Sequence, residues 1–425
     1  MKRLLILVAL VLSVALTQWA QSPRELFAKN LKVSASNSYA YPSADLPKLT
    51  PAPKGYKPFY IDHYGRHGSR WLVSTKQYSI PVEQLAIAER NGKLTERGKE
   101  LLSVLREMKD DSNNRLGDLT DLGAEQHRGI AQRMYRNFPA VFADSASIDA
   151  RATVVIRCVL SMENELQELR MLNPKLKIFH DASQADMHYM NYNDTVVRNK
   201  RKFVDNTVAK FGENKVNPDY MLGKLFTDMK FAHDSIDAKT LITNLFDVIG
   251  NMQSHKKYEN ISFFDIFSQD EIYGLWESGN VFWYLYSGAS PLTNGRMPYS
   301  QANLLRNMIE SADNAIATGK NGAALRFGHE VCLTPLACLM ELNNCGAVVD
   351  NLDELGDKWQ DYKIFPMGCN IQMIFYRKPG NKDILVKVLL NEHEAKLPIA
   401  TNMAPYYHWD ELKAYYLNKL AKQKN

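Results

Sequence analysis

Short apolar segments that alternate with amphipathic segments define the first third of the chain. Residues Lys57–Asp62 are strand-like, and the later segments Leu94–Gly98 and Leu119–His127 each open a helical pattern with threonine at the N-cap position. The segment Ser147–Ile156 predicts a second strand that runs through the β-prone residues Ala152–Ile156 into a loop. Strands that alternate with helices in this way are typical of α/β folds.

The pattern changes between residues 173 and 300, where amphipathic helices and aromatic loops replace the strands. Helical spacing of apolar residues predicts helices that include Val204–Lys210, Ala238–Ile249 and Ile272–Tyr286. This region is therefore predicted to be mostly helical, in contrast to the segments that flank it.

The last part of the chain returns to strands and helices. A helix is predicted at Gln301–Ala317, a short strand at Leu325–Gly328 and a closing helix at Asp410–Ala421. The strands Ile371–Tyr376 and Ile384–Leu390 flank a turn that contains Pro and Gly, which predicts a hairpin. The expected fold class is α/β, with a mixed sheet flanked by helices and catalytic loops at the C-terminal ends of strands.

The N-terminal residues 1–20 contain Lys2 and Arg3 followed by an apolar run, which predicts a secretory signal peptide. A buried core helix is the competing interpretation of this run. Residues 21–56, rich in Ser, Ala, Pro and Tyr, are expected to form an N-terminal arm. Since no later segment is apolar for long enough to cross a membrane, we expect an exported protein, periplasmic or secreted, with no membrane span.

The composition narrows the class of partner. The chain has 425 residues, of which 45% are hydrophobic and 23% charged, so it is long and apolar enough for a sizeable core. Its formal net charge of +5 favours encounter with anions but is dilute over this length. No basic helix, zinc-finger spacing or aromatic and basic RNA motif accompanies the charge, so no nucleic-acid partner is predicted.

Five cysteines leave at least one unpaired in any intramolecular scheme. If Leu333–Leu342 is helical, Cys332 and Cys338 are separated by roughly 9 Å of axial rise, too far for an easy bridge. Any disulfide is therefore expected to involve Cys345 or Cys369. No pair of cysteines has metal-ligand spacing, and we predict neither a metal nor another cofactor.

The segment Tyr60–Arg70 places a histidine between two arginines directly after the first predicted strand. Arg66 and Arg70 offer planar sets of donors that match phosphate oxygens, and Gly68 permits a tight turn that brings backbone N–H groups near an anion. A neutral imidazole at His67 can attack phosphorus when its other ring nitrogen is held as N–H. A solvated basic loop with a satisfied histidine is the alternative for this segment taken alone.

The pattern Arg-His-Gly-X-Arg after a strand resembles that of the histidine acid phosphatases, and the resemblance extends from about Pro58 to the C-terminal region. It implies a core formed by residues 57–172 and 301–425, with the mostly helical insertion 173–300 covering the active-site cleft. The family also carries a helix start similar to Leu119–His127. Its third phosphate-binding arginine falls on Arg157, with Arg151 and Thr153 as apparent support.

The segment 327–331 supplies the second half of the expected site. The family has His-Asp here, and the resemblance assigns His329 to phosphate binding and Glu330 to protonation of the leaving oxygen, ahead of a helix expected to begin near Pro335. Glu330 departs from the family by one methylene. A phosphate dianion beside a carboxyl group favours its protonated form, which makes Glu330 a possible general acid.

The overall resemblance is greatest to multiple inositol polyphosphate phosphatase-like proteins of bacteria. It implies an exported phosphomonoesterase that works through a phosphohistidine and acts on inositol polyphosphates such as phytate. A broad-specificity or sugar-phosphate acid phosphatase, or a non-catalytic phosphate or inositol-phosphate binder, remain the alternatives. The basic run Arg198–Lys202 is either a contact for a polyphosphorylated ring or a solvated helix face.

Overall fold

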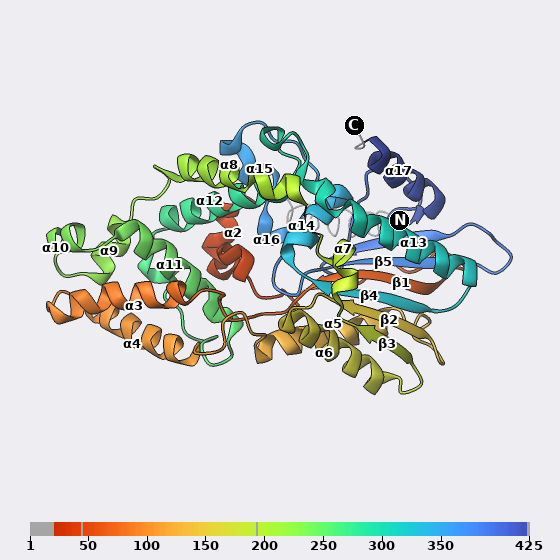
Figure 1. The fold of residues 1–425 in the computed structure, drawn as a ribbon, viewed down its shortest axis with the longest axis horizontal. Helices are drawn as coiled ribbons and strands as arrows, with labels where there is room; N and C mark the ends of the chain where they lie inside the picture. The colour runs from red at the N-terminus through yellow and green to blue at the C-terminus, as the bar shows by residue number, and fades with distance from the viewer. Residues whose placement is uncertain (1–20, 44–45, 193, 423–425) are drawn as a thin grey trace, which may run out of the picture.

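The computed structural model describes residues 21–43, 46–192 and 194–422, so the predicted signal peptide lies outside the described part. An eight-stranded mixed sheet forms the right half of Figure 1, in the order β3-β2-β4-β1-β5-β6-β7, with β8 paired to β6. The strands are β1 Lys57–Arg66, β2 Ser147–Ala152, β3 Lys177–Asp181, β4 Gly322–Gly328, β5 Asn370–Arg377, β6 Leu385–Leu390, β7 His393–Glu394 and β8 Tyr407–His408. The predicted fold class is therefore confirmed.

The central strands bring the two halves of the expected site to one edge of the sheet. Strand β4 is parallel to both β1 and β2, whereas β5 and β6 are antiparallel and form the predicted hairpin. The carboxyl ends of parallel neighbours meet at the same edge. The loops that follow β1, β2 and β4 consequently converge, although they are far apart in the chain.

Helices cover both faces of the sheet and also form a separate group beyond its edge (Figure 1). Helices α5 and α6 pack on one face of the sheet, where Ile61 of β1 is buried. Helices α13, α14 and α17 pack on the other face, where Tyr64 of β1 is buried. The helices are α2 Pro23–Lys29, α3 Thr75–Arg90, α4 Glu96–Asp111, α5 Asp121–Asn137, α6 Ile156–Leu172, α7 Met187–Met190, α8 Thr195–Gly212, α9 Asp219–Leu225, α10 Met229–Ser235, α11 Ala238–Asn251, α12 Gln269–Ser287, α13 Ala302–Thr318, α14 Glu330–Leu339, α15 Leu355–Lys358, α16 Asp361–Ile364 and α17 Trp409–Ala421.

The helical group has an apolar core of its own, to which Leu101 of α4, Leu245 of α11 and Trp276 of α12 contribute. The helices predicted within residues 173–300 are present, but α3 and α4 pack in the same core and precede this range. Strand β3, which lies within the range, pairs with β2 in the sheet. The limits predicted for the insertion thus enclose only part of the helical group.

The N-terminal arm also joins this group. Helix α2 begins at Pro23 after a capping box formed by Ser22 and Glu25, and the 3-10 helix η1 covers Leu31–Ser38. Phe27 and Val33 are buried in the helical core. The apolar residues of the arm therefore anchor it, and η1 lies close to the sheet edge where the site forms.

Two predicted boundaries near the site are wrong. Strand β2 ends at Ala152. The β-prone run does not continue the strand: Val155, in an extended conformation, is the N-cap residue of helix α6, which begins at Ile156. Helix α14 begins at Glu330 rather than near Pro335, which lies inside it. Pro335 lacks the backbone N–H that would donate to the carbonyl of Val331, so the helix loses one hydrogen bond. Val331 is an exposed residue of the first turn.

Within the described residues, no helix is both long enough and apolar enough to cross a membrane. All five cysteines lie in the described part, and each is buried and unpaired. The structure therefore contains no disulfide at Cys345 or Cys369, where sequence reasoning had expected any such bond. Burial raises the pKa of the Cys158 thiol to about 12, so this side chain behaves as a neutral core residue.

Candidate active site

The loop after β1 is held against the start of helix α5. The backbone carbonyl of Ser69 accepts hydrogen bonds from the backbone N–H and the hydroxyl of Thr120, and its N–H donates to the side chain of Gln126. A Cβ atom on Gly68 would lie 2.4 Å from the carbonyl oxygen of Gly123. Two glycines therefore permit direct backbone contact, which explains why the threonine, glycine and glutamine of this helix start occur together.

The loop fixes the tautomer of His67. Its Nδ1 lies 2.9 Å from the carbonyl oxygen of Gly68, which can only accept a hydrogen bond, so Nδ1 carries the proton when the ring is neutral. Burial and the charges of Arg66, Arg157 and Arg70 hold the pKa of His67 well below its usual value. The imidazole is consequently neutral at neutral pH, with the lone pair on Nε2.

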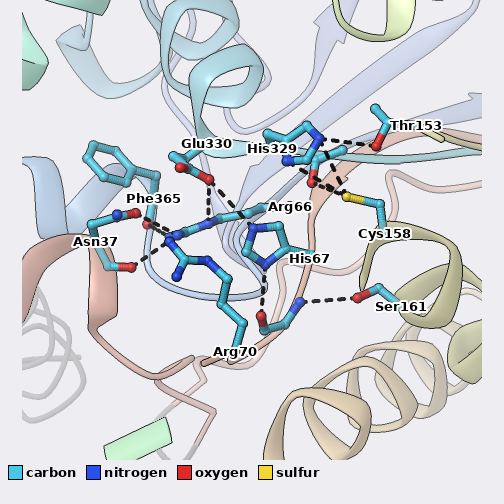
Figure 2. A network of polar contacts seen from close by, with 12 residues as sticks. Asn37, Arg66, His67, Arg70, Thr153, Cys158, Ser161, His329, Glu330 and Phe365 are labelled. Carbon is cyan, nitrogen blue, oxygen red and sulfur yellow. Dashed lines mark hydrogen bonds and ion pairs between the residues drawn. The ribbon is translucent and has the colours of Figure 1, made fainter. Parts of the chain in front are cut away.

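Arg66 is oriented by acceptors from three parts of the chain. Its Nη1 donates to the carbonyl of Phe365 at 2.8 Å, and Nη2 donates to the carbonyl of Asn37 at 3.0 Å and to its amide oxygen at 2.5 Å. The Nε atom lies 3.0 Å from Oε2 of Glu330 (Figure 2). The guanidinium is thus fixed in place, and its Nε faces the carboxylate of Glu330.

Three further nitrogen atoms of the site are buried and have no hydrogen-bond partner within the described residues: Nε2 of His67, Nε of Arg70 and Nε of Arg157. Arg70 donates from Nη1 to the carbonyl of Trp71, and Figure 2 shows its guanidinium beside that of Arg66 and near the imidazole of His67. Buried donors are normally satisfied. The Nε–H groups of Arg70 and Arg157 are therefore donors left for an oxyanion, whereas Nε2 of His67 keeps its lone pair.

Glu330 opens helix α14 and lies close to His67. Its Oε2 is 3.8 Å from Nε2 of His67, and its side chain is 13% exposed. Burial raises the pKa of Glu330, but the charges of Arg66 and Arg70 outweigh burial and lower the pKa to about 2. Without a bound anion, the carboxyl group is therefore ionised and serves as a counter-ion for the arginines.

His329 is the N-cap residue of the same helix and faces His67, with the two imidazole centres 5.8 Å apart. Nε2 of His329 lies 3.1 Å from the hydroxyl of Thr153, so Thr153 contacts His329 rather than Arg157. Burial and the charge of Arg157 lower the pKa of His329 to about 4, although Glu330 opposes this. Arg151 pairs with Asp149 at 2.9 Å, on the sheet and not among the site residues.

The only group of metal-ligand residue types within the described chain is also found here. Ligand atoms of His67, His329 and Glu330 lie within 4.8 Å of one another. Two imidazoles and a carboxylate are a donor set that zinc accepts. The positive charges of Arg66 and Arg70 beside them oppose a dication, so the electrostatics of the site fit an anion better.

The structure thus brings together the residues predicted from the sequence: Arg66, His67, Arg70, Arg157, His329 and Glu330. Sequence reasoning missed Asn37, whose arm carries no motif that could identify it. The basic run 198–202 lies on helix α8, where Arg201 pairs with Asp205 at 2.9 Å. Most of its side chains are exposed, and the guanidinium of Arg201 lies 5.0 Å over the ring of Phe282.

Known proteins with this fold include phosphatases. The multiple inositol polyphosphate phosphatase of Bifidobacterium longum, in complex with inositol hexasulfate, is 18% identical with a TM-score of 0.72, covering 90% of this chain and 97% of that one. The phytase from D. castellii is 15% identical with a TM-score of 0.69, covering 92% and 86%. No curated protein matches the sequence. A family model described as histidine phosphatase superfamily (branch 2) matches residues 65–391, and the chain therefore belongs to that superfamily.

Proposed function

We propose that the protein hydrolyses phosphate monoesters by double displacement through a phosphohistidine at His67. The observation that carries the proposal is the neutral imidazole whose free Nε2 faces the donors of Arg66 and Arg70. A nucleophile inside an oxyanion site is the arrangement that this reaction needs. Membership of the histidine phosphatase superfamily supports phosphatase activity for the chain.

In the first step, Nε2 of His67 forms a bond to phosphorus while the bond from phosphorus to the ester oxygen breaks. Glu330, protonated in the complex, donates its proton to the departing oxygen, so the alcohol leaves neutral. In the second step, the Glu330 carboxylate accepts a proton from water, whose oxygen attacks phosphorus. The bond to His67 breaks, phosphate leaves and the neutral imidazole is restored.

Arg66, Arg70, Arg157 and His329 have the role of holding the phosphoryl oxygens in both steps. Guanidinium groups offer planar sets of N–H donors that match phosphoryl oxygens, so the three arginines can stabilise the charge in both steps. Phosphoryl transfer relies mainly on positioning and charge stabilisation. The side chains present can supply both, and the proposal assigns no role to a metal or cofactor.

The alcohol part of the substrate is a separate question. Inositol polyphosphates are the class that the sequence favours, and the B. longum phosphatase structure holds an inositol hexasulfate, which supports this choice. Broad-specificity or sugar-phosphate hydrolysis is the alternative within the same reaction. A non-catalytic binder is the other alternative, but a binder needs no imidazole held in its nucleophilic tautomer.

The test is a rapid-quench experiment with a radiolabelled phosphate monoester. Wild-type protein should carry acid-labile, base-stable label on His67 during turnover. His67→Ala should carry none, while still binding inorganic phosphate because the arginines remain. Label on a serine, or unchanged turnover in His67→Ala, would exclude this mechanism.

Export is proposed as well, on the basis of the basic and then apolar pattern of residues 1–20. Expression of the full chain in a bacterial host, followed by fractionation and N-terminal sequencing, tests it. We expect a shortened protein outside the cytoplasm. A full-length protein confined to the cytoplasm would argue against export.

A further inference from the structure

A cavity of about 500 Å³ lies in the helical group next to the arginines of the site. Helices α8, α11 and α12 line it together with η1, and these helices lie beyond the edge of the sheet in Figure 1. Arg70 and Asn37, the residue that orients Arg66, belong to its wall. Its volume is in the range of small-molecule pockets.

Val73, a residue of the cavity wall, lies near Arg157 of the site. Val73 lines the cavity, and its Cγ1 atom lies 3.5 Å from the position that a Cβ atom of Gly117 would occupy. Nη1 of Arg157 lies 3.4 Å from the same point. Because Arg70 and Val73 both face the cavity, a group bonded to a phosphate between Arg70 and Arg157 has the cavity directly beside it.

The wall of this cavity is mainly apolar. Leu72, Ile242 and Leu275 belong to it, together with the half-buried aromatic residues Phe282 and Trp283. Half-buried apolar side chains at a cavity gain free energy when a ligand removes them from water. A substrate group that fills this space is therefore favoured when it is apolar.

The charges in the wall oppose a polyphosphorylated substrate. Besides Arg70, Lys239 is the sole basic residue that lines the cavity, and it is accompanied by two acidic residues, Glu213 and Asp247. A ring that carries several phosphates needs a cation for each group that it brings out of water. One lysine against two carboxyl groups does not meet this need.

Exposed apolar side chains also stand next to site residues in the chain. The residues next in the chain to Thr153, Arg157 and Glu330 include exposed apolar side chains: Val154, Ile156 and Val331. Ile156 is 70% exposed. Exposed apolar groups beside a binding site are typical of contact surfaces for apolar ligands. Among the residues that line the cavity, Arg70 and Lys239 are the basic ones, and the guanidinium of Arg201 lies 5.0 Å over the ring of Phe282.

From this placement we infer that the preferred substrate is a monoester with a single phosphate and an apolar alcohol part, which occupies the cavity between α8, α11 and α12. The inference rests on the proposed function, because it concerns the leaving group of that reaction. On the evidence of the cavity wall it favours aliphatic or aromatic monophosphates over the inositol polyphosphates that the likeness to the B. longum phosphatase supports. The phosphate would lie at the arginines of the site, and the alcohol part would contact Leu72 and Phe282.

The test uses a series of straight-chain alkyl phosphates, from ethyl to octyl, with phytate as the comparison. The alcohols differ little in basicity, so changes in kcat/KM report contacts with the alkyl chain. We expect kcat/KM to rise roughly threefold for each methylene that enters the cavity. We also expect phytate to be hydrolysed with a lower kcat/KM than hexyl phosphate. A flat series, or a higher value for phytate, would overturn the inference.

Val208→Lys examines the cavity wall directly, with Val196→Lys as a matched control on the same helix. Val208 lines the cavity, whereas Val196 is exposed and does not. We expect Val208→Lys to lose the dependence on chain length and to improve phytate relative to octyl phosphate at least tenfold. Val196→Lys should behave as the wild type. Equal behaviour of the two variants would contradict the inference.

Should Val208→Lys fail to fold, Phe282→Ala examines the same wall. Its control is Phe203→Ala, because Phe203 of α8 is exposed and does not line the cavity. The expected result is a loss of at least tenfold for octyl phosphate and a small change for ethyl phosphate. Failure of the reaction itself is distinguishable. Absence of hydrolysis and of label on His67 refutes the proposed function together with this inference, whereas labelling with a flat alkyl series refutes the inference alone.

Discussion

Replacement of Glu330 by glutamine should have opposite effects on binding and on turnover. In the structure, Oε2 of Glu330 is 3.0 Å from Nε of Arg66 and 3.8 Å from Nε2 of His67. A phosphorus atom in position for attack lies about 3 to 3.5 Å from the nucleophile. The carboxylate therefore occupies space and a donor that the phosphoryl group requires, and an incoming anion must displace it.

The magnitude follows from the charges. Two unit charges about 4 Å apart interact by about 4 kcal/mol at an effective dielectric constant of 20, and a bound phosphate would be repelled by Glu330 on this scale. Protonation and movement of Glu330 relieve most of this repulsion in the wild type. If about 1.4 kcal/mol remains, Glu330→Gln should bind inorganic phosphate about tenfold more tightly. Loss of a general acid should lower turnover by about 100-fold or more.

The assay combines phosphate titration with kinetics on two substrates. For Glu330→Gln, an alkyl phosphate should lose about 100-fold in kcat, whereas an activated aryl phosphate should lose far less, because its oxygen leaves without a proton. Glu330→Asp should retain part of the activity, since the carboxyl group remains. Weaker phosphate binding with equal, small losses on both substrates would show that Glu330 acts only as a structural counter-ion at a helix N-terminus.

Three further predictions use other features of the site. First, burial and the charge of Arg66 hold the pKa of His67 low, so its imidazole should stay neutral at mildly acid pH. The kcat/KM for an aryl phosphate should therefore not fall between about pH 7 and pH 5. A loss centred near the ordinary pKa of histidine would contradict this. Second, exhaustive treatment with EDTA should leave activity unchanged and vanadate should inhibit; loss of activity that zinc restores would show that His67, His329 and Glu330 hold a metal. Third, Gly123→Ala should destabilise the fold by about 2 kcal/mol or more and lower activity, because its Cβ would lie 2.3 Å from the carbonyl oxygen of Ser69. Gly223→Ala in helix α9 is its control in thermal unfolding, since its Cβ would meet only Sδ of Met229, at 4.0 Å.

The sequence was sufficient for the parts of the site that depend on local pattern. Arg66, His67 and Arg70 follow a strand whose apolar residues identify it, and His329 follows another. Parallel pairing of these strands then brings both loops to one edge, as expected for an α/β sheet. Spacing within a motif is a local property, which explains why these positions could be predicted before the fold was known.

Contacts between distant segments could not be predicted in the same way. Asn37 orients Arg66 only because the N-terminal arm packs on the helical group, and nothing in its own sequence indicates this. The run up to Ile156 has high strand propensity, yet α6 begins there, because packing against the sheet overrides propensity. The ion pair between Arg66 and Glu330 likewise reflects a site without an anion, whereas sequence reasoning considered Glu330 beside a phosphate.

The hydrogen bond from Nδ1 of His67 to the carbonyl of Gly68 has a consequence for how such a protein can change over generations. The acceptor is a backbone atom of the next residue, so no side-chain substitution elsewhere can remove it while the loop keeps its path. Most mutations therefore leave the tautomer and orientation of His67 unchanged. The cavity wall, by contrast, consists largely of side chains that can be exchanged one at a time. Substrate preference can thus diverge while the chemistry of phosphate transfer is inherited unaltered.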